Sequence, residues 1–159
     1  MSAALVIYEE EARRLSGICE RLTRDASAKV VFLVDKNGQL ITSAGQSQGV
    51  DTTSLASLTA GNVAAMGGLA KLIGEEEFPS QFHEGENESL HMTIVARKAV
   101  LVVVFDARTS LGLVRLRVKK AAEEISRELE QLAKHQTPPG TRSPLAEITD
   151  EEIDNLFSA

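Results

Sequence analysis

The side chains that most often carry catalysis or bind metals are few in this sequence and widely separated. One cysteine and three histidines are present, at Cys19, His83, His91 and His135. No two of them have the close spacing of zinc ligands, and no local signature pairs the cysteine with a histidine as a nucleophile. Gly67-Gly68 is followed by Leu-Ala instead of the Lys-Ser of a phosphate-binding loop. We therefore expect no catalytic residue, no metal site and no cofactor.

A different pattern, suited to binding and not to catalysis, stands out in the helix predicted from Asp51 or Thr52 to about Ile73. Small or polar residues recur at spacings of four and three and line one face: Ser57, Gly61, Ala64, Gly68 and Lys71, bordered by Ala60, Ala65 and Gly67. Each glycine inside a helix costs roughly 1 kcal/mol relative to alanine, so the three glycines together cost about 3 kcal/mol.

Close approach of another surface would offset that cost. The opposite face of the helix is the better candidate for the core, with Leu55, Leu58, Met66, Leu69 and Ile73. The small-residue face is then free to receive a partner. Close packing of the glycines against the chain's own sheet or a neighbouring helix is the alternative.

The C-terminal segment carries a second binding signal. Thr149 and Glu152 fit a capping box, and Ile148 with Ile153 fits a hydrophobic staple, so residues 148–159 contain a short amphipathic helix. A helix of about nine residues is marginal alone in water, which favours docking on a partner. A frayed tail, or one that folds onto its own domain, is the alternative. The side chains expected to carry the contact are Ile153, Leu156 and Phe157.

Composition limits the class of protein. The chain has 159 residues, 43% of them apolar, and a net charge of −6, which suits one globular domain and argues against a nucleic-acid binder. The N-terminus carries acids at 9–11 where a signal peptide would be apolar, and the longest apolar run, at 99–105, is too short to span a membrane. A single cysteine fits a reducing compartment, so we expect a cytoplasmic protein.

The remaining periodicities give an alternating set of helices and strands. Helices are expected at 5–25, at 51–73 and from 109 to about 132, and strands at 29–35, 39–44, 82–84, 90–95 and 99–105. Asn37-Gly38 predicts a hairpin between the first two strands. His91 alternates with Thr93 along its strand, and we expect both to face solvent.

These elements predict an α/β (α+β) sandwich of order α-β-β-α-β-β-β-α, with a five-stranded, antiparallel-rich sheet. The domain is expected to span residues 1–134. Residues 135–147, which are rich in proline and lack apolar periodicity, predict a flexible linker to the C-terminal helix.

Three stretches resemble the Roadblock/dynein light chain family: KVVFLVDKNGQLITSAG, DTTSLASLTAGNVAAMGGLAKLIGE and VLVVVFDARTSLGLVRLRVKKA. The likeness covers residues 5–159 and is strongest to the bacterial members that pair with MglA, a Ras-like GTPase of cell polarity and gliding motility. It is a likeness of the whole chain and not of a compact motif.

The resemblance implies a homodimer that binds a GTP-bound, MglA-like small GTPase and accelerates GTP hydrolysis by rearranging its switch regions, without an arginine finger. It also implies that the small-residue face meets the GTPase, and that the protein concentrates at a cell pole. A non-catalytic dimeric scaffold or adaptor for polarity proteins is the alternative. An activator that inserts Arg97 or Arg108, both in turns, ranks last.

Overall fold

The fold is built around two hairpins whose strands are rich in β-branched residues. The computed structural model describes residues 7–135. β1 (Val30–Asp35) and β2 (Leu40–Gly45) are antiparallel and are joined through the predicted Asn37-Gly38 turn. Gly38 has a φ of +91°, a conformation that a residue with a Cβ rarely adopts, which explains the glycine at this position. The hairpin prediction is confirmed.

The second hairpin supplies the centre of the sheet. β4 (Ser89–Val95) and β5 (Ala99–Phe105) are joined by three residues, 96–98. Ala96 and Arg97 have φ angles of 54° and 58°, and the Lys98 N–H donates to the Val95 carbonyl at 3.0 Å, which closes a tight turn. β5 lies between β4 and β1, in agreement with its unbroken apolar run. β3 (Ser80–His83) pairs with β4 and begins two residues earlier than predicted. The strand order is β2-β1-β5-β4-β3, antiparallel throughout.

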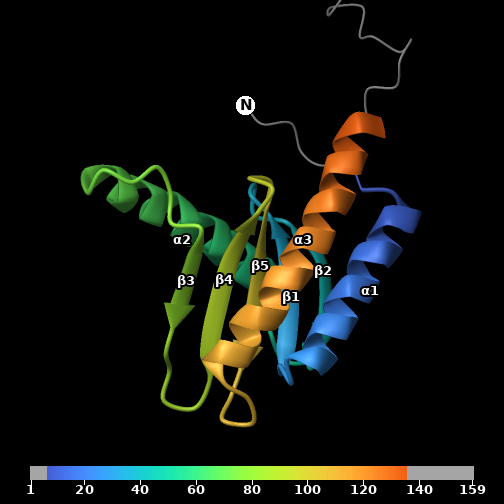
Figure 1. Ribbon diagram of the computed structural model, residues 1–159, viewed down its shortest axis with the longest axis horizontal. Helices are drawn as coiled ribbons and strands as arrows, with labels where there is room; N and C mark the ends of the chain where they lie inside the picture. Colours follow the sequence, from blue (N-terminus) through green and yellow to red (C-terminus); the bar gives the residue numbers. More distant parts are fainter. Residues whose placement is uncertain (1–6, 136–159) are drawn as a thin grey trace, which may run out of the picture.

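The three helices form two layers on the sheet. α1 (Glu9–Asp25) and α3 (Leu111–His135) lie side by side on one face, and α2 (Thr52–Leu72) lies on the other (Figure 1). Ion pairs join α1 to α3, from Arg14 to Glu128 at 2.9 Å and from Arg21 to Glu124 at 3.0 Å. The predicted element order and the sandwich architecture are confirmed.

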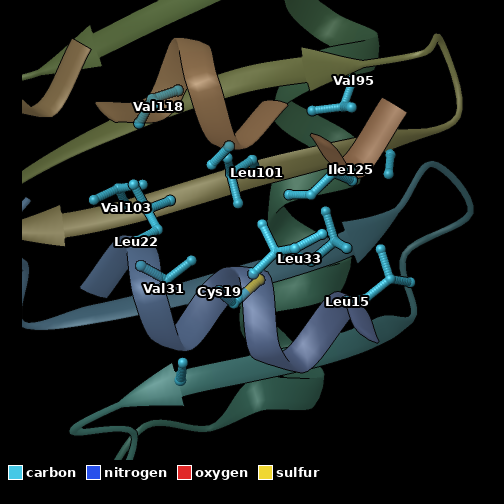
Figure 2. Close-up of a cluster of buried hydrophobic side chains, with 14 of the residues drawn as sticks. Leu15, Cys19, Leu22, Val31, Leu33, Val95, Leu101, Val103, Val118 and Ile125 are labelled. Atoms are coloured by element: carbon cyan, nitrogen blue, oxygen red, sulfur yellow. The ribbon is translucent and has the colours of Figure 1, made fainter. Parts of the chain in front are cut away.

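The sheet separates two apolar cores because side chains alternate along each strand. The larger core fills the space beneath α1 and α3 and includes Cys19, Leu33, Leu101 and Ile125 (Figure 2). Phe32 and its alternating neighbours point to the other face, where they meet α2 in a smaller core. β1 is therefore buried on both faces.

The element boundaries lie close to those expected from sequence, with a few differences. α1 begins at Glu9, and residues 1–6 lie outside the described part of the chain. α3 continues to His135. The predicted linker beyond it and the C-terminal helix at 148–159 also lie outside the described residues, so the division into domain, linker and tail stays a prediction. No helix between residues 7 and 135 is long and apolar enough to cross a bilayer.

Candidate partner-binding surface

α2 is the most exposed of the three helices in its middle and C-terminal parts. It begins at the expected cap, where Asp51 Oδ1 accepts the Ser54 backbone N–H at 3.1 Å. Hydrogen bonds from the Ser54 hydroxyl and backbone lower the pKa of Asp51, because they stabilise the carboxylate. Of the 21 residues of α2, the buried ones are Ala56, Thr59 and Ala70. Most of the helix surface is therefore free to meet another molecule.

The predicted small-residue face is open to solvent along its length. The residues that the sequence assigned to this face are all exposed: Ser57, Gly61, Ala64, Ala65, Gly68 and Lys71. A Cβ built on Gly61, Gly67 or Gly68 would meet no atom within 4 Å. Within residues 7–135, the three glycines therefore have no internal close contact to offset their cost in helix stability.

Part of this face forms one wall of an open groove of about 460 Å³. Ala64, Gly68 and Lys71 line it, together with Lys36 from the β1–β2 turn and Glu77 from the segment after α2. Lys36 Nζ lies 3.6 Å from Glu77 Oε1, a partly exposed ion pair that is worth little by itself. The structure thus brings three of the predicted residues to the groove. Ser57, Gly61 and Ala65 lie outside its lining on the same helix.

The prediction that the larger apolar residues of α2 face the core is wrong for Leu58, Leu69 and Ile73. Leu55 and Met66 are partly buried, but Leu58 and Leu69 are 72% and 47% exposed and Ile73 is exposed as well. α2 contacts β1 and β2 through a narrow strip that holds the buried Ala56 and the partly buried Leu55 and Val63. Leu58, Leu69 and the 84% exposed Leu72 form a second surface, the leucine stripe. Apolar spacing identifies a hydrophobic face of a helix, but it does not show whether that face packs in the core or stays on the surface.

The other residues considered from sequence lack a catalytic arrangement in the described chain. The Arg108 guanidinium is paired with Asp106 at 3.0 Å, and this pair lowers the pKa of the Asp106 carboxyl. Arg97 is exposed in its turn and, like Arg108, is not part of the α2 groove. Burial raises the pKa of the Cys19 thiol to about 12. Residues 7–135 hold no group of three or more potential metal ligands.

His91 does not face solvent, in contrast to the sequence expectation. It shares a sheet face with Thr93, as predicted. However, α3 packs over that face, and His91 is only 3% exposed. Its Nδ1 lies 3.3 Å from Thr93 Oγ1. Burial lowers the pKa of His91, and the nearby Arg115 charge lowers it further. Strand alternation predicted the shared face, but the position of α3 could not be read from it.

Comparison with known proteins now identifies the class. Residues 16–105 match the Roadblock/LC7 domain, and the chain belongs to that family. No curated protein sequence matches the chain. A Roadblock/LC7 domain from Streptomyces avermitilis, 12% identical with a TM-score of 0.63 over 72% of this chain and 97% of its own, shares the fold.

Within the family, the chain is similar to MglB. Myxococcus xanthus MglB is 72% identical with a TM-score of 0.78, over 82% of this chain and 98% of its own. The gliding protein MglB of Thermus thermophilus is 33% identical with a TM-score of 0.76, over 82% of this chain and 99% of its own. The protein is thus an MglB-like Roadblock protein.

Proposed function

We propose that this protein is a GTPase-activating regulator of an MglA-like, Ras-like small GTPase in bacterial cell polarity and gliding motility. The similarity to MglB, including a relative described as a gliding protein, supports this assignment. The observation that carries it is the exposed small-residue face of α2, whose glycines face open space. A GTPase that packs closely on this face would offset the cost of those glycines.

Activation proceeds by selection of a GTPase conformation. The dimer binds the GTP-bound switch regions and stabilises the arrangement in which the catalytic groups of the GTPase are aligned. Arg108 is held by Asp106 in its own turn, which is consistent with a mechanism that inserts no arginine. Stabilisation of the transition-state charge then comes from the GTPase itself.

The C-terminal helix provides a second contact on the GTPase, away from the small-residue face. Ile153, Leu156 and Phe157 supply the apolar side of that contact, and the tail acids meet basic groups. Tethering by the linker makes this contact effectively intramolecular once the domain has bound, so a weak interaction is sufficient.

The active unit is a homodimer. β3 is an edge strand in the described chain, and its free edge can pair with a second copy. The leucine stripe on α2 is a large exposed apolar surface of the kind that an interface buries. A relative that is 33% identical is described as having a tetrameric arrangement, which shows that an MglB relative assembles into oligomers.

The test places large charged side chains on the small-residue face. Ala64→Arg with Gly68→Arg is expected to abolish binding of the GTP-bound GTPase while leaving the protein folded, because both positions are exposed and arginine is a good helix former. Gly112→Arg is the matched control, since Gly112 is an exposed α3 glycine with equally open surroundings.

Stimulated GTP hydrolysis is measured with each variant. If the double variant activates as well as wild type, the docking face is wrong. If wild type binds the GTPase without raising its turnover, the protein is a scaffold and not an activator.

A further inference from the structure

A second groove lies on the opposite face of the sheet from α2, between α3 and β4. Its volume is about 600 Å³. β4 and the start of β3 form its floor, and α3 forms one wall. α1 packs on β2 and β1, and α3 packs on β4, so the described chain provides no helix over β3 on this side. Neither α1 nor α3 crosses in front of β3 in Figure 1. The groove therefore runs along the side of α3 that has no neighbouring helix.

The groove is mostly apolar, and its α3 wall is basic. Its apolar lining residues are Val118, Ala122, Ile94 and Pro79, and its floor also carries Ser80, His91 and Thr93. Arg115 and Lys119 lie along the same wall, and neither makes an ion pair within residues 7–135. Glu123 is the acid among the lining residues. An amphipathic segment with one apolar side and several acids has the complementary chemistry.

We propose that residues 148–157 of the same chain occupy this groove in the free protein. Their apolar side consists of Ile153, Leu156 and Phe157, and the last thirteen residues of the sequence hold five acids and no base. The apolar side chains pack against the partly exposed Ala122 on the α3 wall, and Asp150 and Glu151 meet the exposed Arg115 and Lys119. Burial of this apolar surface stabilises a helix that is too short to persist alone.

The length of chain beyond α3 is sufficient for this contact. α3 ends at His135, thirteen residues after Ala122, a distance of about 20 Å along the helix axis. The following residues, 136–147, have a typical reach of about 20 Å and a fully extended length of about 40 Å. The tail can therefore fold back along α3 to the groove. Its effective concentration there is near the millimolar range, which favours the chain's own tail over the tail of a separate molecule in solution.

This site and the GTPase compete for the same three apolar side chains. The contact between tail and groove does not depend on a GTPase. Its role in regulating GTPase binding rests on the proposed function. In the free protein the tail is held on α3, and it is released when the bound GTPase offers a better surface. The groove thus limits tail binding to partners that the small-residue face has already selected.

Disulfide trapping in the full-length chain tests the proposal without any GTPase. Ala122→Cys with Ser158→Cys places one thiol in the groove and one in the tail, and keeps all three apolar side chains of the tail. Lys120→Cys with Ser158→Cys is the control, because Lys120 lies on the α1 side of α3 beside Arg21 and Asp25. The native Cys19 is buried and does not interfere.

The groove pair is expected to form an intrachain disulfide about tenfold faster than the control pair, at a rate that does not depend on protein concentration. Equal rates for the two pairs would overturn the proposal. Disulfides that form only between copies would overturn it as well, and would assign the groove to a second copy of the chain.

A charge-reversal pair then tests the basic wall. Lys119→Glu is expected to slow disulfide formation by the groove pair several-fold, and the neighbouring Lys120→Glu is expected to leave it unchanged. Asp150→Lys with Glu151→Lys should restore the rate in the Lys119→Glu background. Equal effects of the two lysine changes would show that general charge, and not this groove, attracts the tail. That result would overturn the proposal.

Discussion

At the scale of single residues, His91 of β4 is buried and lies near the positive charge of Arg115. Alternation along a strand correctly placed His91 and Thr93 on one sheet face, because the period of a strand is a local property. Whether that face meets water depends on where α3 packs, and a strand sequence does not contain this information. The outcome is a 3% exposed histidine beside Arg115, with a lowered pKa caused first by burial and second by that positive charge.

The lowered pKa makes His91 a source of acid sensitivity. Below its ordinary pKa of 6.5, the unfolded chain binds a proton that the folded chain resists, so folding stability falls as pH decreases through this range toward the folded pKa. His91→Gln should reduce the loss of unfolding free energy between about pH 7.5 and about pH 5.5, measured by urea denaturation. His83→Gln is the control, because His83 is exposed. An unchanged pH dependence in His91→Gln would refute this assignment.

At the scale of elements, α2 shows what the sequence could and could not predict. Its bounds were read correctly to within about a residue, and Asp51, one of the two expected starts, is its cap, since caps and periodicity are local signals. The face that packs on the sheet was read only in part, because Ala56 and the partly buried Leu55 and Val63 meet the smaller core, whereas the leucine stripe is exposed. The three glycines have open space around them in the described chain, and their close contact with a partner stays a prediction.

Replacing a glycine of α2 by alanine should stabilise the fold and weaken binding to the GTPase. Gly68→Ala should raise the unfolding free energy by about 1 kcal/mol, because alanine favours the helix and its Cβ meets no atom within 4 Å. The same methyl group should weaken binding to the GTP-bound GTPase. Urea denaturation and a binding titration measure the two effects.

Gly38→Ala serves as the contrasting control for stability. Gly38 has a φ of +91°, so alanine there is strained and should lower the unfolding free energy. A Gly68→Ala protein that is more stable and binds the GTPase as tightly as wild type would argue against close approach at this position.

At the scale of the whole molecule, the exposed leucine stripe predicts a stable homodimer. Sedimentation equilibrium at micromolar concentration should give twice the 17.1 kDa mass of the chain. Leu72→Glu should shift the protein toward monomer, because a charge at an 84% exposed position is harmless to the fold but costly when buried in an interface. Leu116→Glu, at an exposed leucine of α3, should leave the dimer intact. A wild-type monomer would contradict the prediction.

The proposed contacts of the tail belong to the same scale. Its helix signature is local and was read from sequence, but its binding partner is not, because both the α3 groove and a GTPase can complete a short amphipathic helix. Truncation after Lys134 should lower affinity for the GTP-bound GTPase while hydrolysis that depends on the α2 face persists. Arg115→Glu with Lys119→Glu should have the opposite effect on affinity, since it weakens the competing groove and frees the tail.

Binding titrations, GTP turnover and nucleotide release are compared for the truncated chain, the groove variant and wild type. If truncation changes none of them, the tail does not contact the GTPase, although disulfide trapping can still place it in the groove. If truncation lowers affinity and the groove variant does not raise it, the tail contacts the GTPase without competition from α3. The two results together therefore show whether the tail contacts the GTPase, and whether the α3 groove competes with the GTPase for the tail.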